Sequence, residues 1–211
     1  MKIVIMGASR GTGAEAAKIA LARGHEVTAF ARTPSRLTIE HPKLNKLAGD
    51  FHNRESVASS VRGQTAVIIT VSFTSFKALR DNPNYYSQGT GYAIEAMKAH
   101  GPRRLVVLSA WGVGESRKLA NFFVDTLVIS FLLKAVYEDH ERQEKLVRES
   151  GLDWVIARPT RLTNGPARGR YVKNSGLGPV PLSISRADTA DFLVTAAGVD
   201  TWVHQAVQLG G

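Results

Sequence analysis

The sequence contains no cysteine, which excludes disulfide bonds, a catalytic thiolate and thiolate metal ligands. The six histidines are dispersed without the paired spacing of a zinc site, so we predict no metal. Long apolar runs are also lacking. The LVISFLL stretch at 127–133 is far below the roughly 20 residues that span a bilayer, and the MKIVIMG start is too short for a signal peptide. We therefore expect a cytoplasmic protein with no membrane association.

Acidic residues are outnumbered, 18 Asp and Glu against 27 Lys and Arg, which gives a formal net charge of +9. An excess of this size raises the question of nucleic acid as a partner. The basic residues, however, are scattered, with no run longer than two and no interleaved aromatic residues. We therefore predict no nucleic-acid surface and expect a phosphorylated small molecule as the partner.

The order of predicted elements indicates an α/β fold. The 211 residues, 44% hydrophobic and 21% charged, predict a single domain over 1–211. Strands that are apolar throughout are buried on both faces, and their alternation with helices predicts a doubly wound, Rossmann-like parallel sheet with helices on both faces. The predicted strands are 2–6, 25–31, 45–48, 65–71, 104–110 and 153–157, and the predicted helices are 12–23, 54–61, 85–100 and a long region at 118–149. A looser, small C-terminal substrate region follows, with substrate-side segments at about 112–136 and 165–185.

A glycine-rich stretch, GASRGTG, directly follows the first predicted strand. Gly7, Gly11 and Gly13 have the spacing G-x-x-x-G-x-G and open the first helix. A helix N-terminus binds phosphate through its unpaired amides and positive dipole end, and glycine lets the phosphate approach the backbone. The stretch therefore predicts a dinucleotide-binding loop.

The second strand indicates which dinucleotide is bound. NAD-binding units place a carboxylate at the end of this strand, on the ribose 2′-hydroxyl, whereas arginine there accommodates a 2′-phosphate. Here Arg32 follows the strand, Arg36 lies one helical turn on, and Arg10 lies in the glycine loop. We predict that NADP(H) is preferred over NAD(H).

The segments GASRGTG, FARTPSRL, AGD, AVIITVS, IEAMKAHG, VVLSA and ESGLDWVIARPTRL together resemble the atypical short-chain dehydrogenase/reductases over nearly the whole chain. The resemblance is greatest to the NmrA-like NAD(P)H-binding proteins and to the biliverdin reductase B, or flavin reductase, group. It implies a Rossmann-fold reductase that uses NADPH. The acceptor would be flat and conjugated: a flavin, a biliverdin-like tetrapyrrole or a quinone.

The resemblance also assigns residues to the cofactor. Those implied at the pyrophosphate are Gly7, Ser9, Arg10, Gly11, Thr12 and Gly13, and those at the 2′-phosphate are Arg32 and Arg36. Those implied at the adenine are Asp50 and Phe51, and those toward the ribose and nicotinamide are Val71, Ser72, Ser87, Ser109, Pro159, Thr160 and Arg161. The chain departs from the family at Arg10-Gly11, where a Gly-x pair is usual, and at Arg161, where the biliverdin reductase group has histidine.

The reacting end lacks the tyrosine-lysine pair that carbonyl-reducing relatives use, because Glu141 stands four residues after Tyr137. Ser109, His140 and Tyr137 are the candidate catalytic residues, although a local backbone partner for Ser109 and a surface position for the other two are the alternatives. A conjugated acceptor takes its proton from solvent without such a pair. A redox sensor that binds NADP(H) without turnover, or a sugar-nucleotide epimerase or dehydratase, are the alternative functions. Monomer and homodimer both stay open.

Overall fold

The computed structural model describes residues 1–72, 76–119 and 133–211. Its main sheet has eight strands in the order β3-β2-β1-β4-β5-β6-β10-β8, of which only β8 pairs antiparallel. The parallel strands are β1 (Lys2–Met6), β2 (Glu26–Ala31), β3 (Leu44–Ala48), β4 (Ala66–Ile69), β5 (Arg104–Leu108), β6 (Asp153–Pro159) and β10 (Gln205–Gly210). Beyond β10 lies β8 (Val172–Asn174), and β7 (Arg161–Thr163) and β9 (Ser183–Ser185) form a separate parallel pair. The predicted doubly wound sheet is confirmed.

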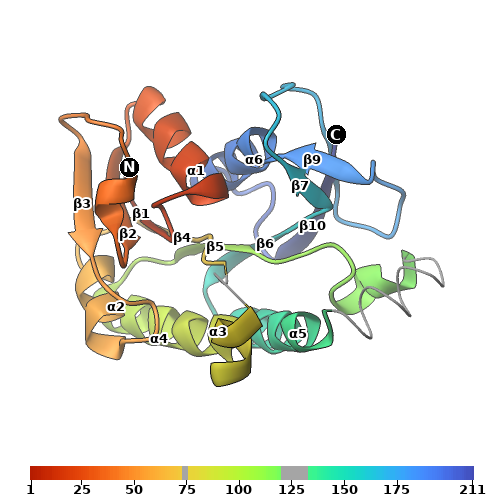
Figure 1. Cartoon of the computed structure of the whole chain (residues 1–211), viewed down its shortest axis with the longest axis horizontal. Coiled ribbons are helices and arrows are strands. Elements are labelled where there is room, and N and C mark those ends of the chain that lie inside the picture. Colours follow the sequence, from red (N-terminus) through yellow and green to blue (C-terminus); the bar gives the residue numbers. More distant parts are fainter. Residues whose placement is uncertain (73–75, 120–132) are drawn as a thin grey trace.

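Helices cover both faces of the sheet (Figure 1). One face carries α1 (Gly11–Ala22) and α6 (Arg186–Gly198), which pack against each other. The other carries α2 (Arg54–Val61), α4 (Tyr85–His100) and α5 (Lys134–Arg148). The shorter helices are η1 (Pro34–Arg36), α3 (Phe76–Asp81) and η2 (Gly114–Leu119). Among the residues that the structure describes, no helix has the length and apolar character needed to cross a membrane.

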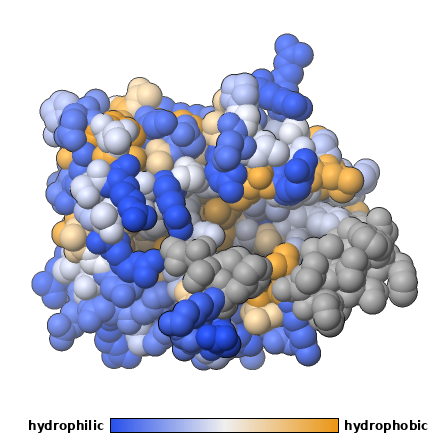
Figure 2. Space-filling view, viewed as in Figure 1, coloured by the Kyte–Doolittle hydropathy of each residue, from blue (hydrophilic) through white to orange (hydrophobic). Residues whose placement is uncertain are grey.

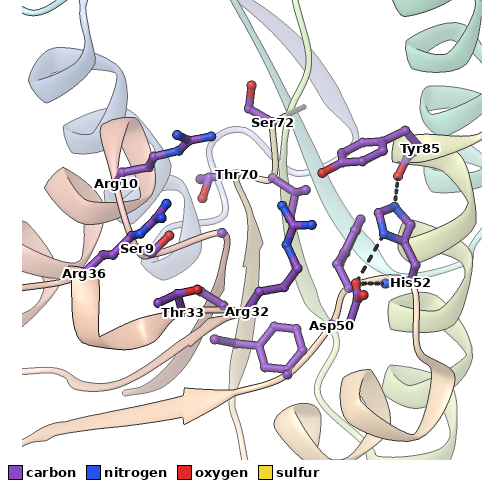
Figure 3. A pocket seen from close by; sticks show the side chains of 16 residues that line it. Ser9, Arg10, Arg32, Thr33, Arg36, Asp50, His52, Thr70, Ser72 and Tyr85 are labelled. Atoms are coloured by element: carbon purple, nitrogen blue, oxygen red, sulfur yellow. Dashed lines mark hydrogen bonds and ion pairs between the residues drawn. The ribbon is translucent and has the colours of Figure 1, made fainter. Parts of the chain in front are cut away.

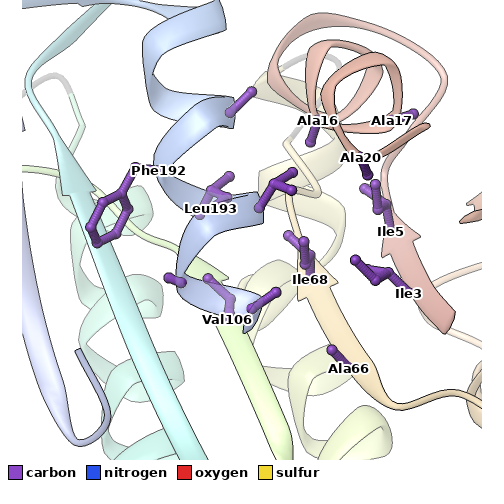
Figure 4. Close-up of a cluster of buried hydrophobic side chains, with 14 of the residues drawn as sticks. Ile3, Ile5, Ala16, Ala17, Ala20, Ala66, Ile68, Val106, Phe192 and Leu193 are labelled. Atoms are coloured by element: carbon purple, nitrogen blue, oxygen red, sulfur yellow. The ribbon is translucent and has the colours of Figure 1, made fainter. Parts of the chain in front are cut away.

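The sheet separates the two largest hydrophobic clusters among the described residues. On the α1 and α6 face, Ile3, Ile5 and Ile68 of the sheet pack beneath helix residues that are fully buried (Figure 4). Alanines at the inner face of α1 let the helix lie close to the strands, which fixes the position of its N-terminus above the end of β1.

The chain reverses its direction of winding between β1 and β4. Met6 pairs with Phe30 of β2 on one side and with Ile69 of β4 on the other. The connections from these strands lead to opposite faces, which leaves a crevice at their carboxyl ends. Open parallel sheets bind ligands at such a switch point.

Two expectations about the second half of the chain differ from the structure. The helix expected over 118–149 is described as η2 up to Leu119 and as α5 over Lys134–Arg148, and residues 120–132 lie outside the described part. The expectation of a looser C-terminal region is wrong, because α6 packs on the sheet and β10 extends it beside β6. Both elements are mostly buried, so neither has the alternating pattern that marks a half-exposed element.

Candidate functional site

The glycine loop connects the end of β1 to α1. Gly7 has φ +88° and Gly11 has φ +58°, conformations that favour glycine. The Gly7 amide donates to the Phe30 carbonyl oxygen at 2.9 Å, and a Cβ on Gly7 would lie 2.9 Å from the Val71 Cα. The loop is therefore held against the ends of β2 and β4.

Gly13 allows α1 to lie close to the sheet. A Cβ there would lie 2.5 Å from Oγ1 of Thr70 and closer still to the Gly7 carbonyl oxygen. The Thr70 hydroxyl, in turn, donates to the Met6 carbonyl oxygen at 2.8 Å and ties β4 to β1. Gly13 therefore lies beneath the loop, and it lines neither of the two cavities described below.

The N-terminus of α1 is open. Its N-cap residue, Arg10, makes no side-chain capping hydrogen bond, and its first turn contains no acidic residue. Its free amides and its positive dipole end therefore face the crevice, where they favour an anion.

A first cavity, here called the arginine cavity, opens beside this helix end (Figure 3). Arg10, Arg32 and Arg36 border it on one side, and Asp50, His52 and Tyr85 border it on the other. The residues predicted from the sequence to contact the cofactor that line this cavity are Gly7, Ser9, Arg10, Arg32, Arg36, Asp50, Phe51, Val71 and Ser72. The sequence analysis did not identify Thr33, His52, Thr70 or Tyr85 as lining residues.

Charge is unbalanced in the arginine cavity. Within the described parts of the chain, no carboxylate lies within 4.0 Å of Arg10, Arg32 or Arg36. Asp50 on the far wall is engaged locally, since its Oδ1 accepts from the His52 amide at 2.9 Å. The cavity can therefore accept a ligand with a multiply charged anionic group at its arginine side.

A second cavity, here called the serine-histidine cavity, continues from the first. It holds about 500 Å³, the size of a small-molecule site. The two share Arg10, Thr70, Val71 and Ser72, so they form one cleft along the carboxyl ends of the strands. The predicted residues that line it are Arg10, Gly11, Thr12, Val71, Ser72, Ser109 and His140. In space-filling view, the molecule is hollowed between its two helical layers (Figure 2).

Ser109 is held by a buried ion pair. Its hydroxyl donates to Oε1 of Glu144 at 2.7 Å, and Arg158 donates to both oxygens of that carboxylate, from Nε at 2.9 Å and from Nη2 at 2.5 Å. Arg158 also contacts Glu115 at 2.8 Å. Burial opposes the charge of Arg158, but the hydrogen bonds and charges of Glu144 and Glu115 raise its pKa. Because the hydroxyl proton points to Glu144, Ser109 presents oxygen lone pairs as an acceptor.

His140 is buried and oriented by its neighbours. Its Nδ1 forms a hydrogen bond of 2.9 Å with Oε1 of Gln143. The amide nitrogen of Gln143 in turn donates to the Thr90 hydroxyl oxygen at 2.9 Å. The ring stacks on Tyr86 with the centroids 4.0 Å apart. Burial lowers the pKa of His140 more than Gln143 and the nearby carboxylates raise it. The imidazole is therefore neutral near pH 7, with Nδ1–H donating and Nε2 left as an acceptor.

Asp139, the residue before His140, fixes the start of α4. It is fully buried, and its carboxylate accepts from the Tyr86 amide at 2.6 Å and from the Ser87 hydroxyl at 2.5 Å. The side chain of Asn84 forms no cap of its own, so α5 supplies the carboxylate at this helix end.

Several predicted residues line neither cavity. Ser87 is committed to Asp139, and the Tyr137 hydroxyl donates to the Trp111 carbonyl oxygen at 3.1 Å. Pro159, Thr160 and Arg161 lie where β6 passes into β7. Thr160 donates to the Leu209 carbonyl oxygen at 3.2 Å, and Arg161 is exposed. Leu162, Asn164 and Arg186 line the serine-histidine cavity from this side instead.

The substrate-side segment predicted at 112–136 lies partly outside the described residues, and of its described part only Val136 lines the serine-histidine cavity. No residue of the segment predicted at 165–185 lines it. Over the described ranges, no three His, Cys, Asp or Glu side chains gather as metal ligands would.

Comparison with known proteins places this cleft in context. A family model described as NAD(P)H-binding matches residues 7–198. The chain belongs to the NAD(P)H-binding family. The match to this NAD(P)H-binding model begins at the first glycine of the loop and ends at the last residue of α6.

Similar proteins include a 3-diazoavenalumate denitrifying reductase from a Streptomyces species, 30% identical over 216 residues, 92% of this chain and 68% of that protein. Among solved structures, a short-chain dehydrogenase/reductase from Veillonella parvula, in complex with NADP, has a TM-score of 0.83 at 18% identity, covering 100% of this chain and 94% of that one. An anaerobillin reductase from Escherichia coli O157:H7 has a TM-score of 0.81 at 20% identity, covering 100% and 97%. These structures share the fold of the NAD(P)H-binding chain.

The residues present fit a dinucleotide. The start of α1 offers amides for a pyrophosphate, and beside it the arginine cavity offers cations that have no carboxylate partner among the described residues. The shared floor at Thr70, Val71 and Ser72 leads from there to Ser109 and His140.

Proposed function

We propose that this NAD(P)H-binding protein is an NADPH-dependent reductase whose acceptor is a flat conjugated molecule, such as a flavin, a biliverdin-like tetrapyrrole or a quinone. The observation that carries the proposal is the continuous cleft. At one end it has arginines without a carboxylate partner in the described part of the chain, and at the other it has Ser109 and His140. The reductase names of the Streptomyces and Escherichia coli relatives support a reduction reaction.

The preference for NADPH rests on Arg10, Arg32 and Arg36. A 2′-phosphate carries about two negative charges, and guanidinium groups without carboxylate partners bind it through charge-assisted hydrogen bonds. Arg32 follows β2 directly, in the position where NAD-binding units carry a carboxylate.

The test for this preference is the variant Arg32→Glu. Loss of one charge-assisted bond and the added repulsion weaken NADPH binding by about 10- to 100-fold, while NADH binding changes little. Arg170→Glu is the matched control, because it makes the same change in net charge at an exposed residue that lines neither cavity. Equal loss of NADPH and NADH binding in Arg32→Glu would show that Arg32 does not recognise the 2′-phosphate.

At the reacting end, the reduced nicotinamide supplies the hydride when it is bound. The Ser109 hydroxyl donates its hydrogen bond to Glu144, so its oxygen can accept one from the nicotinamide carboxamide or from the electron acceptor. Burial lowers the pKa of His140, so its imidazole is neutral near pH 7 and Nε2 accepts a hydrogen bond instead of donating a proton. We therefore assign His140 to orientation of the acceptor, and the proton reaches the reduced ring from solvent.

Turnover is tested by following NADPH oxidation with FMN, FAD, biliverdin and a small quinone. We expect at least one acceptor to be reduced, with a rate that falls in the Ser109→Ala variant. Tight NADP binding with no turnover across these acceptors would favour a redox sensor instead. Absence of binding of either nicotinamide coenzyme by calorimetry would remove both functions.

A further inference from the structure

Arg186 is the first residue of α6, and its side chain reaches across to the glycine loop. A Cβ on Gly11 would lie 3.5 Å from Nε of Arg186 and 3.7 Å from its Cδ. The guanidinium therefore lies over the first residue of α1, at the helix end that faces the cleft. Arg186 lines both the serine-histidine cavity and a neighbouring cavity above α1.

The guanidinium of Arg186 is oriented but not neutralised. Nη1 donates to Oδ1 of Asn164 at 2.8 Å and to the Leu162 carbonyl oxygen at 3.5 Å. In the described parts of the chain, no carboxylate lies within 4.0 Å of it. Glu15 borders the neighbouring cavity, but it pairs with Lys18 at 2.9 Å.

Two other arginines with restricted exposure, Arg104 and Arg158, have acidic partners. Arg104 pairs with Asp200, and the buried Arg158 pairs with Glu144. A half-buried cation that is held by two neutral oxygens keeps its full charge available to a ligand. Arg186 thus differs from them in having unused charge, and that charge faces the open N-terminus of α1.

We propose that Arg186 binds the pyrophosphate of the dinucleotide from the side opposite the main-chain amides of the glycine loop. The inference rests on the proposed function and adds a binding residue that the sequence analysis did not identify. The pyrophosphate is common to NADPH and NADH, so Arg186 contributes to both. Arg32 and Arg36, in contrast, contribute only where a 2′-phosphate is present.

The proposal is tested with Arg186→Ala, Arg186→Lys and the control Arg170→Ala, each titrated by calorimetry. The probes are NADPH, NADH, ADP-ribose and adenosine 2′-monophosphate, of which only the last lacks a pyrophosphate. We expect Arg186→Ala to weaken the first three by about 10- to 100-fold and the last by less than about twofold. Arg186→Lys keeps the charge without the fork and recovers part of the loss.

The outcomes separate this inference from the proposed function. If the native protein binds NADPH and Arg186→Ala binds it equally well, the Arg186 inference is overturned and the proposed function stands. A loss confined to NADPH and adenosine 2′-monophosphate also overturns it, because that pattern assigns Arg186 to the 2′-phosphate. If the native protein binds no probe, both fall. Circular dichroism reports whether each variant folds. If Arg186→Ala does not fold, Arg186→Lys decides: weaker binding of NADPH, NADH and ADP-ribose than in the native protein supports the inference, and native affinity for all three overturns it.

Discussion

Replacing Glu144 with glutamine tests whether the buried ion pair behind Ser109 stabilises the fold. Glu144→Gln keeps the shape of the side chain but leaves Arg158, 3% exposed, without its main partner. Removal of one member of a buried pair costs about 3–5 kcal/mol. Glu115 still contacts Arg158 at 2.8 Å, so we expect the lower end, about 3 kcal/mol. For a chain of this length that lowers Tm by about 6–12 °C.

The assay is urea unfolding at pH 7, with thermal unfolding alongside. Glu141→Gln is the matched control, since it lies exposed on the same helix, and it should change stability by less than about 0.5 kcal/mol. The double variant Glu144→Leu with Arg158→Met removes both charges and should recover most of the loss. A Glu144→Gln variant as stable as the native protein, or a double variant no better than the single, would refute the reasoning.

Three further predictions concern the packing of Gly13, the pH dependence of stability, and the hydroxyl group of Tyr137. Gly13→Ala crowds the Gly7 carbonyl oxygen and should cost about 1–3 kcal/mol in urea unfolding, with weaker NADPH binding. Burial raises the pKa of Asp188, but backbone and side-chain hydrogen bonds lower it overall. The charged carboxylate therefore stabilises the fold at pH 7, and this stabilisation is lost as the pH falls below 3.8, the usual pKa of aspartate. In urea unfolding, the free energy of unfolding of Asp188→Asn should equal that of the native protein in acid only. Tyr137→Phe should lower stability by about 1 kcal/mol and leave the rate of NADPH oxidation unchanged, because the hydroxyl is committed to Trp111; a large fall in rate would contradict this.

The first half of the fold follows from local pattern. The strand ending at Met6 is apolar and short, and the glycines behind it mark the turn into α1. The predicted boundaries of α2 and α4 agree with the structure, because each has a polar face and an identifiable end. In contrast, α6 is covered by α1 and the sheet, and β10 lies within the sheet, so tertiary contacts define both.

The candidate site divides in the same way. Residues of the loop and of the strand ends, such as Arg32 and Ser109, could be identified because backbone geometry places them. Thr70 follows the same rule at the end of β4, and its position beside Val71 was a sufficient indication. Glu144 and Arg186 act through contacts between segments far apart in the chain, for which a single sequence carries no local pattern.

The start of α4 joins the two ends of the cleft mechanically. Tyr85 faces the arginine cavity, and its chain neighbour Tyr86 faces the serine-histidine cavity. Asp139 of α5 anchors the backbone at this helix end, from which both rings project. The walls of the two cavities therefore share one backbone anchor, and a substitution that removes the Asp139 carboxylate would disturb both of them together.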